Sequence, residues 1–319
     1  MARFVFRRLL LILLAVSLVH FLGYAYAYTL RANNPFLSSG TASESLLQAY
    51  TAYLGQAFQS GLGEMPGARE PIVVALARAA GASLGLITIA FTLSLIAGIG
   101  LGLLAVRTDP PRVARWMTIL STTGLAMPSF YLGILVIVAM FAYVLWRGPG
   151  TLMPLPVGGF GWGRELVLPA LALMARPTVQ IARVTSGLLV AELEKQYVVA
   201  ARSLGHPWRN IRRHIALRNI VAPVIQTIAG SFRLLLAELV IVEQMFFWPG
   251  LGRLLALSLI LPRFTSGFSS ASPFLNPPVL AALLAVLAAL FLIADLVATL
   301  ATRAADPRLR VAEKEAAHA

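Results

Sequence analysis

Six apolar stretches, each long enough to cross a lipid bilayer as a helix, constrain this chain more than any other feature. They cover residues 9–30, 84–106, 118–145, 167–190, 220–247 and 279–301. A hydrocarbon core of about 30 Å is spanned by about 20 residues of α-helix at about 1.5 Å each. Lipid offers the backbone no hydrogen-bond partners, so a spanning segment must pair its own amides and carbonyls. We therefore predict an all-α integral membrane protein with six transmembrane helices.

The composition argues against soluble enzymes and metalloproteins. Of the 319 residues, 58% are hydrophobic and only 12% are charged, and the mean hydropathy is +0.80. The absence of cysteine excludes disulfides, thiolate metal sites and cysteine nucleophiles. The few histidines are scattered along the chain. We predict no catalytic residue, no metal site and no cofactor in this chain.

Membrane topology explains the net charge of +13. The charge comes from 26 Lys and Arg against 13 Asp and Glu, a shortage of acids, so nucleic acid is not an expected partner. When the loops are assigned to alternate sides, sixteen basic residues fall on one side and seven on the other. The positive-inside rule then places both termini, 107–117 and 191–219 in the cytoplasm, and 31–83, 146–166 and 248–278 outside. Contact with anionic headgroups of the lipid bilayer is a secondary consequence.

The N-terminus has the basic start of a secretory signal peptide. The apolar run from Leu9 to Leu30 is longer than the usual hydrophobic region of such a peptide, and no small-residue cleavage site closes it. We interpret residues 1–30 as an uncleaved transmembrane anchor.

Two amphipathic helices are predicted in the external segment 31–83. The first is capped by Ser43 and extends to residue 58. Its apolar residues recur at helical spacing and are Leu46, Leu47, Tyr50, Leu54, Ala57 and Phe58. The second runs from Ile72 to Ala80 and ends at Gly81 before the second span. A helix that lies on the membrane and a helix that docks a substrate-side partner are alternatives here.

The loop between the fourth and fifth spans, residues 192–223, carries a specific helical pattern. The residues at i, i+3, i+4 and i+7 of its first part are Tyr197, Ala200, Ala201 and Leu204. They form one apolar face that alanine keeps flat. Gly205 suits the left-handed residue that ends a helix, and Pro207 suits the first turn of the next one. The pattern predicts a short helix, a bend and a basic helix that enters the fifth span. Such a face fits a groove of a partner protein, and an interfacial membrane helix is the alternative.

Four motifs together resemble those of one transporter family. They are Tyr197–Gly205 with His214–Asn219 and Pro223, Glu243–Leu255 with its Trp-Pro-Gly-Leu-Gly sequence, Pro128–Gly133, and Asp306–Arg310. The first is similar to the EAA loop of ABC importer permeases. The combination resembles the first permease subunit of the dipeptide, oligopeptide and nickel group. The resemblance covers nearly the whole chain.

The resemblance implies a type I ABC importer transmembrane domain in the cytoplasmic membrane of a bacterium or archaeon. Such a permease belongs to a binding-protein-dependent importer, here expected to transport di- or oligopeptides. Its partners would be a second, homologous permease subunit, cytoplasmic ATP-binding subunits and an external solute-binding protein. In this plan residues 84–303 form the permease core and 304–319 a cytoplasmic tail.

The same resemblance assigns the EAA loop to a groove of the ATP-binding subunit. The coupling residues would be Tyr197, Ala200, Ala201, Arg202, Leu204 and Gly205. ATP hydrolysis is expected in the partner, because this chain has no Gly-x-x-x-x-Gly-Lys-Ser/Thr loop. Its glycine-rich run Gly98–Gly102 falls within the second span, where close helix packing explains it.

Ionisable residues within the spans are costly and need partners or a function. Arg233 and Glu238 are five residues apart, so a direct pair on one helix is imperfect, and Glu243 lies near the outer end beside Trp-Pro-Gly. Glu238 either lines the pathway or pairs with Arg233, Arg176 or Arg183. Asp295, late in the sixth span, is expected to make a structural hydrogen bond or to lie at the membrane interface rather than to take part in transport.

Two other functions compete with the importer permease. A stand-alone secondary transporter or channel would be expected to show coupling-ion groups and often an inverted repeat, and the sequence shows neither. A non-transporting membrane scaffold would not require the pattern of residues 192–223. The sequence therefore favours the permease.

Overall fold

The computed structural model describes residues 2–33, 45–148, 150–260 and 273–305. Within these ranges, six helices are long and apolar enough to cross a membrane. They cover Phe4–Ala32, Ile72–Leu104, Ser129–Arg147, Arg164–Leu193, Trp208–Met245 and Pro277–Ala304. The prediction of six spans is confirmed. The predicted cap Ser43, the Asp306–Arg310 motif and the tail lie outside the described residues.

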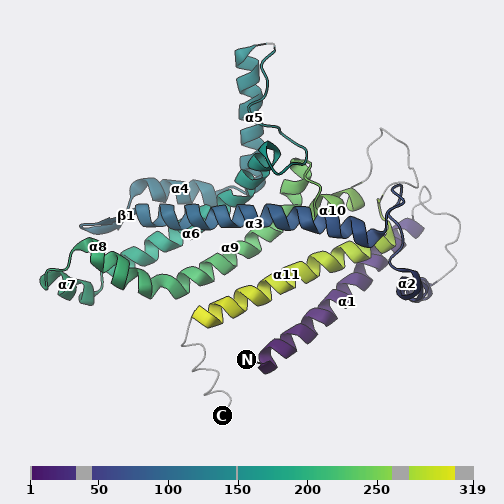
Figure 1. Cartoon of the computed structure of the whole chain (residues 1–319), viewed down its shortest axis with the longest axis horizontal. Coiled ribbons are helices and arrows are strands. Elements are labelled where there is room, and N and C mark those ends of the chain that lie inside the picture. Colours follow the sequence, from purple (N-terminus) through teal and green to yellow (C-terminus); the bar gives the residue numbers. More distant parts are fainter. Residues whose placement is uncertain (1, 34–44, 149, 261–272, 306–319) are drawn as a thin grey trace. The chain divides into compact units, whose positions relative to one another are not determined.

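The chain divides into two compact units. The first contains Met1–Gly85, Gly158–Phe160 and Glu243–Ile293. Its helices are α1 (Ala2–Ala32), α2 (Leu46–Ser60), the first part of α3 (Ile72–Leu104), α10 (Leu251–Leu259) and most of α11 (Pro277–Ala305) (Figure 1). The core of this unit joins α3, α10 and α11 through Ile72, Leu76, Leu251, Val279 and Leu283.

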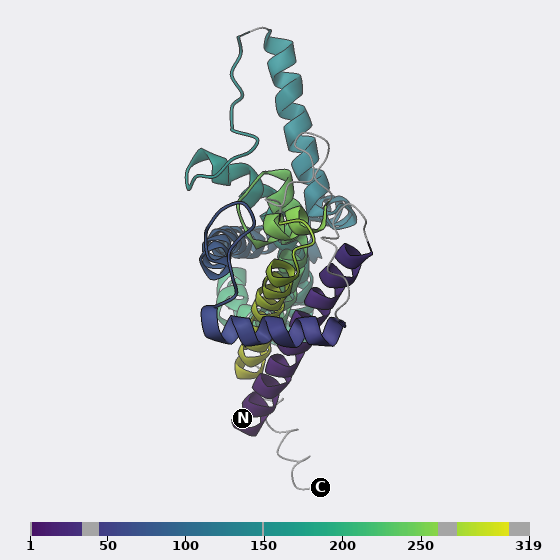
Figure 2. The same cartoon turned by 90° about the vertical axis from the view of Figure 1, so that its right-hand side faces the viewer.

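Helix α2 lies across α1 and is held there by aromatic side chains (Figure 2). Its N-cap is Ser45, which forms a capping box with Gln48, so the helix begins later than a cap at Ser43 would allow. Tyr53 is buried and stacks on Tyr24 of α1 with ring centroids 5.0 Å apart. Phe58, which was predicted on the same apolar face, is 88% exposed. The helix is amphipathic, but the face that packs against α1 is centred on the tyrosines.

Helix α3 is continuous from Ile72 to Leu104, so the predicted end at Gly81 is wrong. A glycine within a helix costs about 1 kcal/mol relative to alanine. Burial of Leu76, Ala79 and Ala82 on either side of Gly81 outweighs that cost. The predicted short external helix and the second span are therefore one element.

The second unit contains Leu86–Val157, Gly161–Val242 and Ala294–Ala319. After α3 come β1 (Val106–Thr108) and β2 (Pro111–Val113), an antiparallel hairpin in which Arg107 faces Arg112. The helices that follow are α4 (Arg115–Ala126), α5 (Ser129–Arg147), α6 (Arg164–Leu193), α7 (Gln196–Ser203), α8 (Trp208–Asn210), a π-helical turn (Ile211–Ala216) and α9 (Leu217–Met245). One core of this unit joins β1, α6, α7 and α9 around Leu189, Val198 and Ile220.

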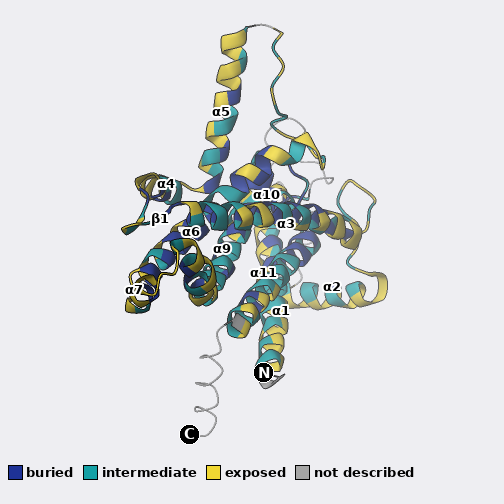
Figure 3. Ribbon diagram, turned by 60° about the vertical axis from the view of Figure 1, so that its left-hand side comes forward, coloured by how far each residue is buried: buried dark blue, intermediate teal, exposed yellow. Residues whose placement is uncertain are grey.

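The predicted third span, 118–145, is two helices and not one. Helix α4 ends at Ala126 and α5 begins at Ser129, with Met127 and Pro128 extended at ψ 132° and 149°. Proline has no amide hydrogen and disfavours a helical residue before it, so the helix breaks at Met127. The membrane span is α5, whose apolar side chains are exposed along much of its length (Figure 3).

Close packing of α3 against α6 explains two glycines. A Cβ added to Gly98 would lie 2.8 Å from Cβ of Ile181, and one added to Gly102 would lie 2.8 Å from Cβ of Thr185. Within the described part of the chain, no atom of a neighbouring element lies within 4 Å of the same position at Gly100. The expected role of the glycine-rich run in helix packing is confirmed.

We predict that Gly98→Ala destabilises the protein by about 1–3 kcal/mol, because α3 and α6 would have to separate to admit the methyl group. The matched control Gly100→Ala meets no neighbour and should leave stability unchanged or raise it by up to about 1 kcal/mol. Thermal unfolding of the purified variants in detergent measures both. Equal melting temperatures for the two variants would contradict the packing assignment.

Candidate coupling site

A short helix between two membrane spans forms the candidate site. Helix α7 starts after Lys195 and ends in a turn in which the amide of Gly205 donates to the carbonyl of Arg202 (2.9 Å) and the amide of His206 to that of Ala201 (3.1 Å). Gly205 has φ 84°, the left-handed conformation predicted for it. This pair of bonds is a Schellman motif and satisfies the last carbonyls of α7.

The second, basic helix of the loop enters the fifth span as predicted. Pro207 lies just before α8, not in its first turn, and α8 continues through the π-helical turn into α9. Arg202 stacks on Trp208 with its guanidinium carbon 4.7 Å from the ring centroid. This contact joins the end of α7 to the start of α8.

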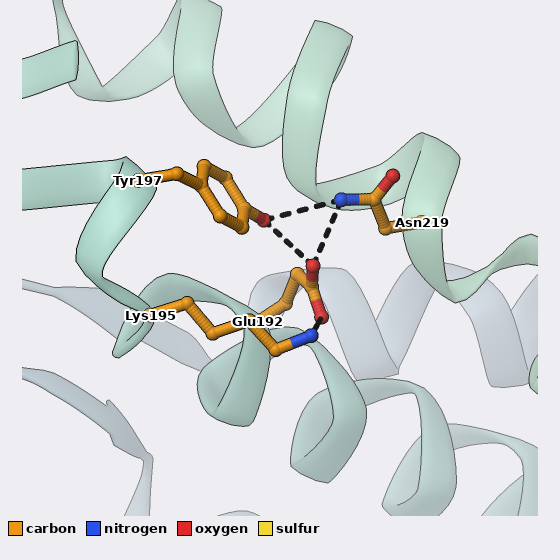
Figure 4. A network of polar contacts seen from close by, with 4 residues as sticks. All are labelled: Glu192, Lys195, Tyr197 and Asn219. Carbon is orange, nitrogen blue, oxygen red and sulfur yellow. Dashed lines mark hydrogen bonds and ion pairs between the residues drawn. The ribbon is translucent and has the colours of Figure 1, made fainter. Parts of the chain in front are cut away.

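The carboxylate of Glu192 ties α7 to both neighbouring helices (Figure 4). Glu192 is the buried penultimate residue of α6. It accepts a hydrogen bond of 2.7 Å from the Tyr197 hydroxyl and one of 2.8 Å from the Asn219 amide of α9. Lys195 Nζ lies 2.6 Å from its other oxygen. One carboxylate thus fixes the positions of α6, α7 and α9 relative to one another.

The environment of Tyr197 favours its neutral hydroxyl. Burial and the adjacent Glu192 carboxylate raise the pKa of Tyr197 to about 12, from an ordinary value of 10. Because the folded pKa is the higher one, the stability contributed by this group is fully present below pH 10 and is lost as the pH rises toward 12. The network is therefore intact at physiological pH.

We predict that Tyr197→Phe weakens the attachment of α7 by about 1.5–3 kcal/mol. The variant loses the hydrogen bond to the Glu192 carboxylate and the one that the Tyr197 hydroxyl accepts from Asn219 (3.3 Å), while Asn219 and Lys195 still bind Glu192. Amide hydrogen exchange in α7 should then be faster by about tenfold or more at neutral pH. Ser203→Ala is the matched control, since its hydroxyl bonds only to the carbonyl of Ala200 within α7. Unchanged exchange in Tyr197→Phe would contradict the positioning role of the hydroxyl.

The predicted apolar face of α7 is divided between the inside and the outside of the unit. Tyr197 is half-buried and Ala201 is buried, and both contact the core around Leu189. Ala200 and Leu204 are exposed, and Leu204 has 79% of its surface free. Val199, which the spacing did not single out, is 65% exposed beside them. The surface open to a partner therefore consists of Val199, Ala200, Leu204 and the exposed Arg202.

Sequence reasoning also missed Glu192 and Asn219, the two anchors of α7. Both lie within the loop 192–223. Glu192 binds Tyr197, five residues later, and Asn219, 27 residues later in the sequence. The signal that could have identified Glu192 is its place as a polar residue in the last turn of an apolar span. No local pattern identifies Asn219 as its partner.

The intramembrane charges of the second unit form pairs between helices. Arg176 Nη1 of α6 lies 2.8 Å from Glu238 of α9, and Ser129, the first residue of α5, donates to the same carboxylate. Arg233 Nε lies 2.7 Å from Asp295 of α11. Glu238 therefore pairs with Arg176, one of the three partners expected for it. The expected structural contact of Asp295 is confirmed.

Glu243 caps a helix in the first unit. It is fully buried and accepts hydrogen bonds from the Ser83 hydroxyl (2.6 Å) and the Gly252 amide (2.7 Å) at the start of α10. A negative charge at this end of a helix is favourable. Trp248 is also fully buried and donates from Nε1 to the carbonyl of Ala82 (3.0 Å). The Trp-Pro-Gly segment thus fixes α10 to α3.

The carboxylates of these sites hold elements of the protein in position. Among the described residues, no three His, Asp or Glu side chains gather as ligands of a metal ion would. The carboxylates Glu192, Glu238 and Glu243 all bind groups of the protein itself.

The profile of the family described as binding-protein-dependent transport system inner membrane component matches residues 94–311. This is more than half of the chain. The chain belongs to this family. It is therefore a transport permease, a multi-pass protein of the cytoplasmic membrane, and it has the fold of a type I ABC importer transmembrane domain. Helix α7 of this chain lies in the loop 192–223, whose sequence resembles the EAA loop.

Named relatives of this permease are transport subunits. The chain is 26% identical to the dipeptide transport system permease protein of Lactococcus lactis, over 83% of this chain and 81% of the relative. It is 27% identical to the glutathione transport system permease protein of Escherichia coli, over 80% and 86%. It is 26% identical to the oligopeptide transport system permease protein of Bacillus subtilis, over 70% and 67%.

Proposed function

We propose that this permease forms half of the translocation pathway of an ATP-driven peptide importer and contacts an ATP-binding subunit through α7. The observation that carries the proposal is the exposed apolar end of α7, Val199, Ala200 and Leu204, on a helix that Glu192 holds in place. An exposed apolar surface on a rigid element is suited to a protein interface. Closure of the partner would then move α6 and α9 through the same carboxylate.

The proposed substrates are di- or oligopeptides. The relatives are named for dipeptide, oligopeptide and glutathione transport, and these substrates are all short peptides. A short free peptide is a zwitterion with one ammonium and one carboxylate group. The pathway must therefore carry two opposite charges through the bilayer.

The proposed complex contains a second, related permease, ATP-binding subunits and an external solute-binding protein. The sequence has no phosphate-binding loop, so ATP hydrolysis is assigned to a partner. Alternating access by rigid-body motion needs two halves that move about a shared pathway. In this plan residues 1–30 are an anchor, 31–83 an external segment, 84–303 the permease core and 304–319 a cytoplasmic tail.

Reconstitution tests this proposal. The purified chain in liposomes should accumulate no peptide, and addition of the partner permease, ATP-binding subunits and loaded solute-binding protein should give ATP-dependent uptake. Co-purification of the intact complex identifies the solute-binding protein and its bound ligand. Accumulation by the chain alone, driven by an ion gradient, would instead favour a secondary transporter.

The proposed orientation has both termini and α7 in the cytoplasm. The chain contains no cysteine, so single cysteines can be introduced as reporters. We predict that a cysteine at Ser203 is not labelled by a membrane-impermeant thiol reagent in intact cells, whereas a cysteine at Leu152, in the predicted outer segment 146–166, is labelled. Both residues are exposed, so accessibility within the fold does not decide the result. The reverse labelling pattern would invert the topology.

A further inference from the structure

Arg176 and Glu238 pair between two candidate membrane spans, and both lie away from the ends of their helices. At about 1.5 Å per residue, Arg176 is roughly 4 Å along the axis from the middle of α6. Glu238 is roughly 10 Å from the end of α9 at Met245 by the same measure. Charged side chains are rare at such depths and face the protein interior or water.

The pair is not sealed inside the protein. The Arg176 side chain is 32% exposed and that of Glu238 is 13% exposed, although the two groups are in direct contact. An exposed guanidinium against lipid tails would lack hydrogen-bond partners for several of its five donors. The exposed part of Arg176 must therefore meet water, a partner protein or a polar solute.

The backbone is interrupted beside the pair. Met127 and Pro128 are extended and exposed between α4 and α5, and the next residue, Ser129, donates to Glu238. The break stands at the start of the span α5, so an exposed, extended segment and a partly exposed cation lie around one carboxylate.

We propose that Arg176, Glu238 and Ser129 form a site in the translocation pathway that binds the charged termini of a peptide. This inference rests on the proposed function. The Arg176 guanidinium takes the peptide carboxylate in a two-pronged contact, and the Glu238 carboxylate takes the peptide ammonium. Without peptide, the two side chains neutralise each other. With peptide bound, Arg176 exchanges the Glu238 carboxylate for the peptide carboxylate, and Glu238 exchanges the Arg176 guanidinium for the peptide ammonium. No buried charge is therefore left without a counter-charge during passage.

A double substitution distinguishes this site from a structural ion pair. In the assembled complex, Arg176→Met with Glu238→Leu removes both charges and leaves no unpaired one. Replacing a purely structural ion pair by apolar residues often leaves stability unchanged. If the pair is only structural, uptake by the double variant should equal that of the wild type. The proposed site predicts a correctly assembled complex whose ATPase is still stimulated by loaded solute-binding protein, but whose peptide uptake falls by about tenfold or more. Wild-type uptake in the double variant would overturn the inference.

Cysteine chemistry provides an independent measurement. Met127→Cys places the cysteine at an exposed position beside the site and leaves Arg176, Glu238 and Ser129 in place. It is tested in the complex with a cationic, water-soluble methanethiosulfonate in each nucleotide state. The cysteine should react in at least one state, and a free tripeptide should slow the reaction about fivefold or more, whereas the same peptide with blocked termini should not. Leu13→Cys in the anchor helix α1 is the lipid-facing control, 69% exposed and expected not to react.

Absence of reaction at position 127 in every nucleotide state, or equal protection by free and blocked peptides, would contradict the site. Peptide uptake by the wild-type complex is measured in the same preparations. If the wild type transports no peptide, the proposed function fails. If the wild type transports peptide and the variants behave like it, only this inference fails.

Discussion

Replacing Glu243 with alanine is expected to destabilise the first unit by about 3 kcal/mol or more. Its carboxylate accepts hydrogen bonds from the Ser83 hydroxyl and from the amides of Gly252 and Arg253, the last at 3.3 Å. Hydrogen bonds to a charged group contribute about 1.5–3 kcal/mol each, and buried donors left without an acceptor add a desolvation cost. Thermal unfolding in detergent should show a clearly lower melting temperature for Glu243→Ala.

Two further substitutions separate the cap from general packing. Gly250→Ala should behave like Glu243→Ala, because a Cβ at Gly250 would overlap the Glu243 carboxylate. Ser83→Ala should cost less, since it removes a hydroxyl that donates to Glu243 and accepts from Leu251 but leaves the carboxylate in place. Wild-type stability of Glu243→Ala would show that α10 does not depend on its cap.

Local sequence signals predicted the spans and the turn of α7. Hydropathy identified six spans because each apolar run must be long enough to cross the bilayer. Gly205 was recognisable because a left-handed residue at a helix end strongly favours glycine. The packing role of Gly98 followed from its position within a span. In each case the physical constraint acts on a few neighbouring residues.

Features that depend on distant neighbours were not predicted. The sequence gives a helical stripe on α7, but only the positions of α6 and α9 determine that Ala201 turns inward and Leu204 outward. The predicted span 118–145 was read as one helix across Pro128, so the break between α4 and α5 was missed. The choice of Arg176 as partner of Glu238 joins residues 62 positions apart. No local rule ranks the candidate arginines.

Helix α7 allows the coupling proposal to be tested without disturbing the fold. Leu204→Glu is expected to lower ATP-driven peptide uptake by about tenfold or more while the melting temperature stays unchanged. The Leu204 side chain is 79% exposed and supports no core of its own unit. In a partner groove, however, the new carboxylate would be buried without a counter-charge, which is strongly unfavourable.

The matched variants locate the effect. Leu152→Glu places the same charge at a leucine that is 87% exposed in the predicted outer segment, and it should leave uptake and ATPase stimulation unchanged. Ala201→Glu introduces the charge at a buried position on the inward side of α7, so it should lower the melting temperature as well as uptake. Loss of uptake in Leu204→Glu with retained stability identifies an external contact. Wild-type uptake in this variant would mean that α7 does not dock the ATP-binding subunit through its exposed end.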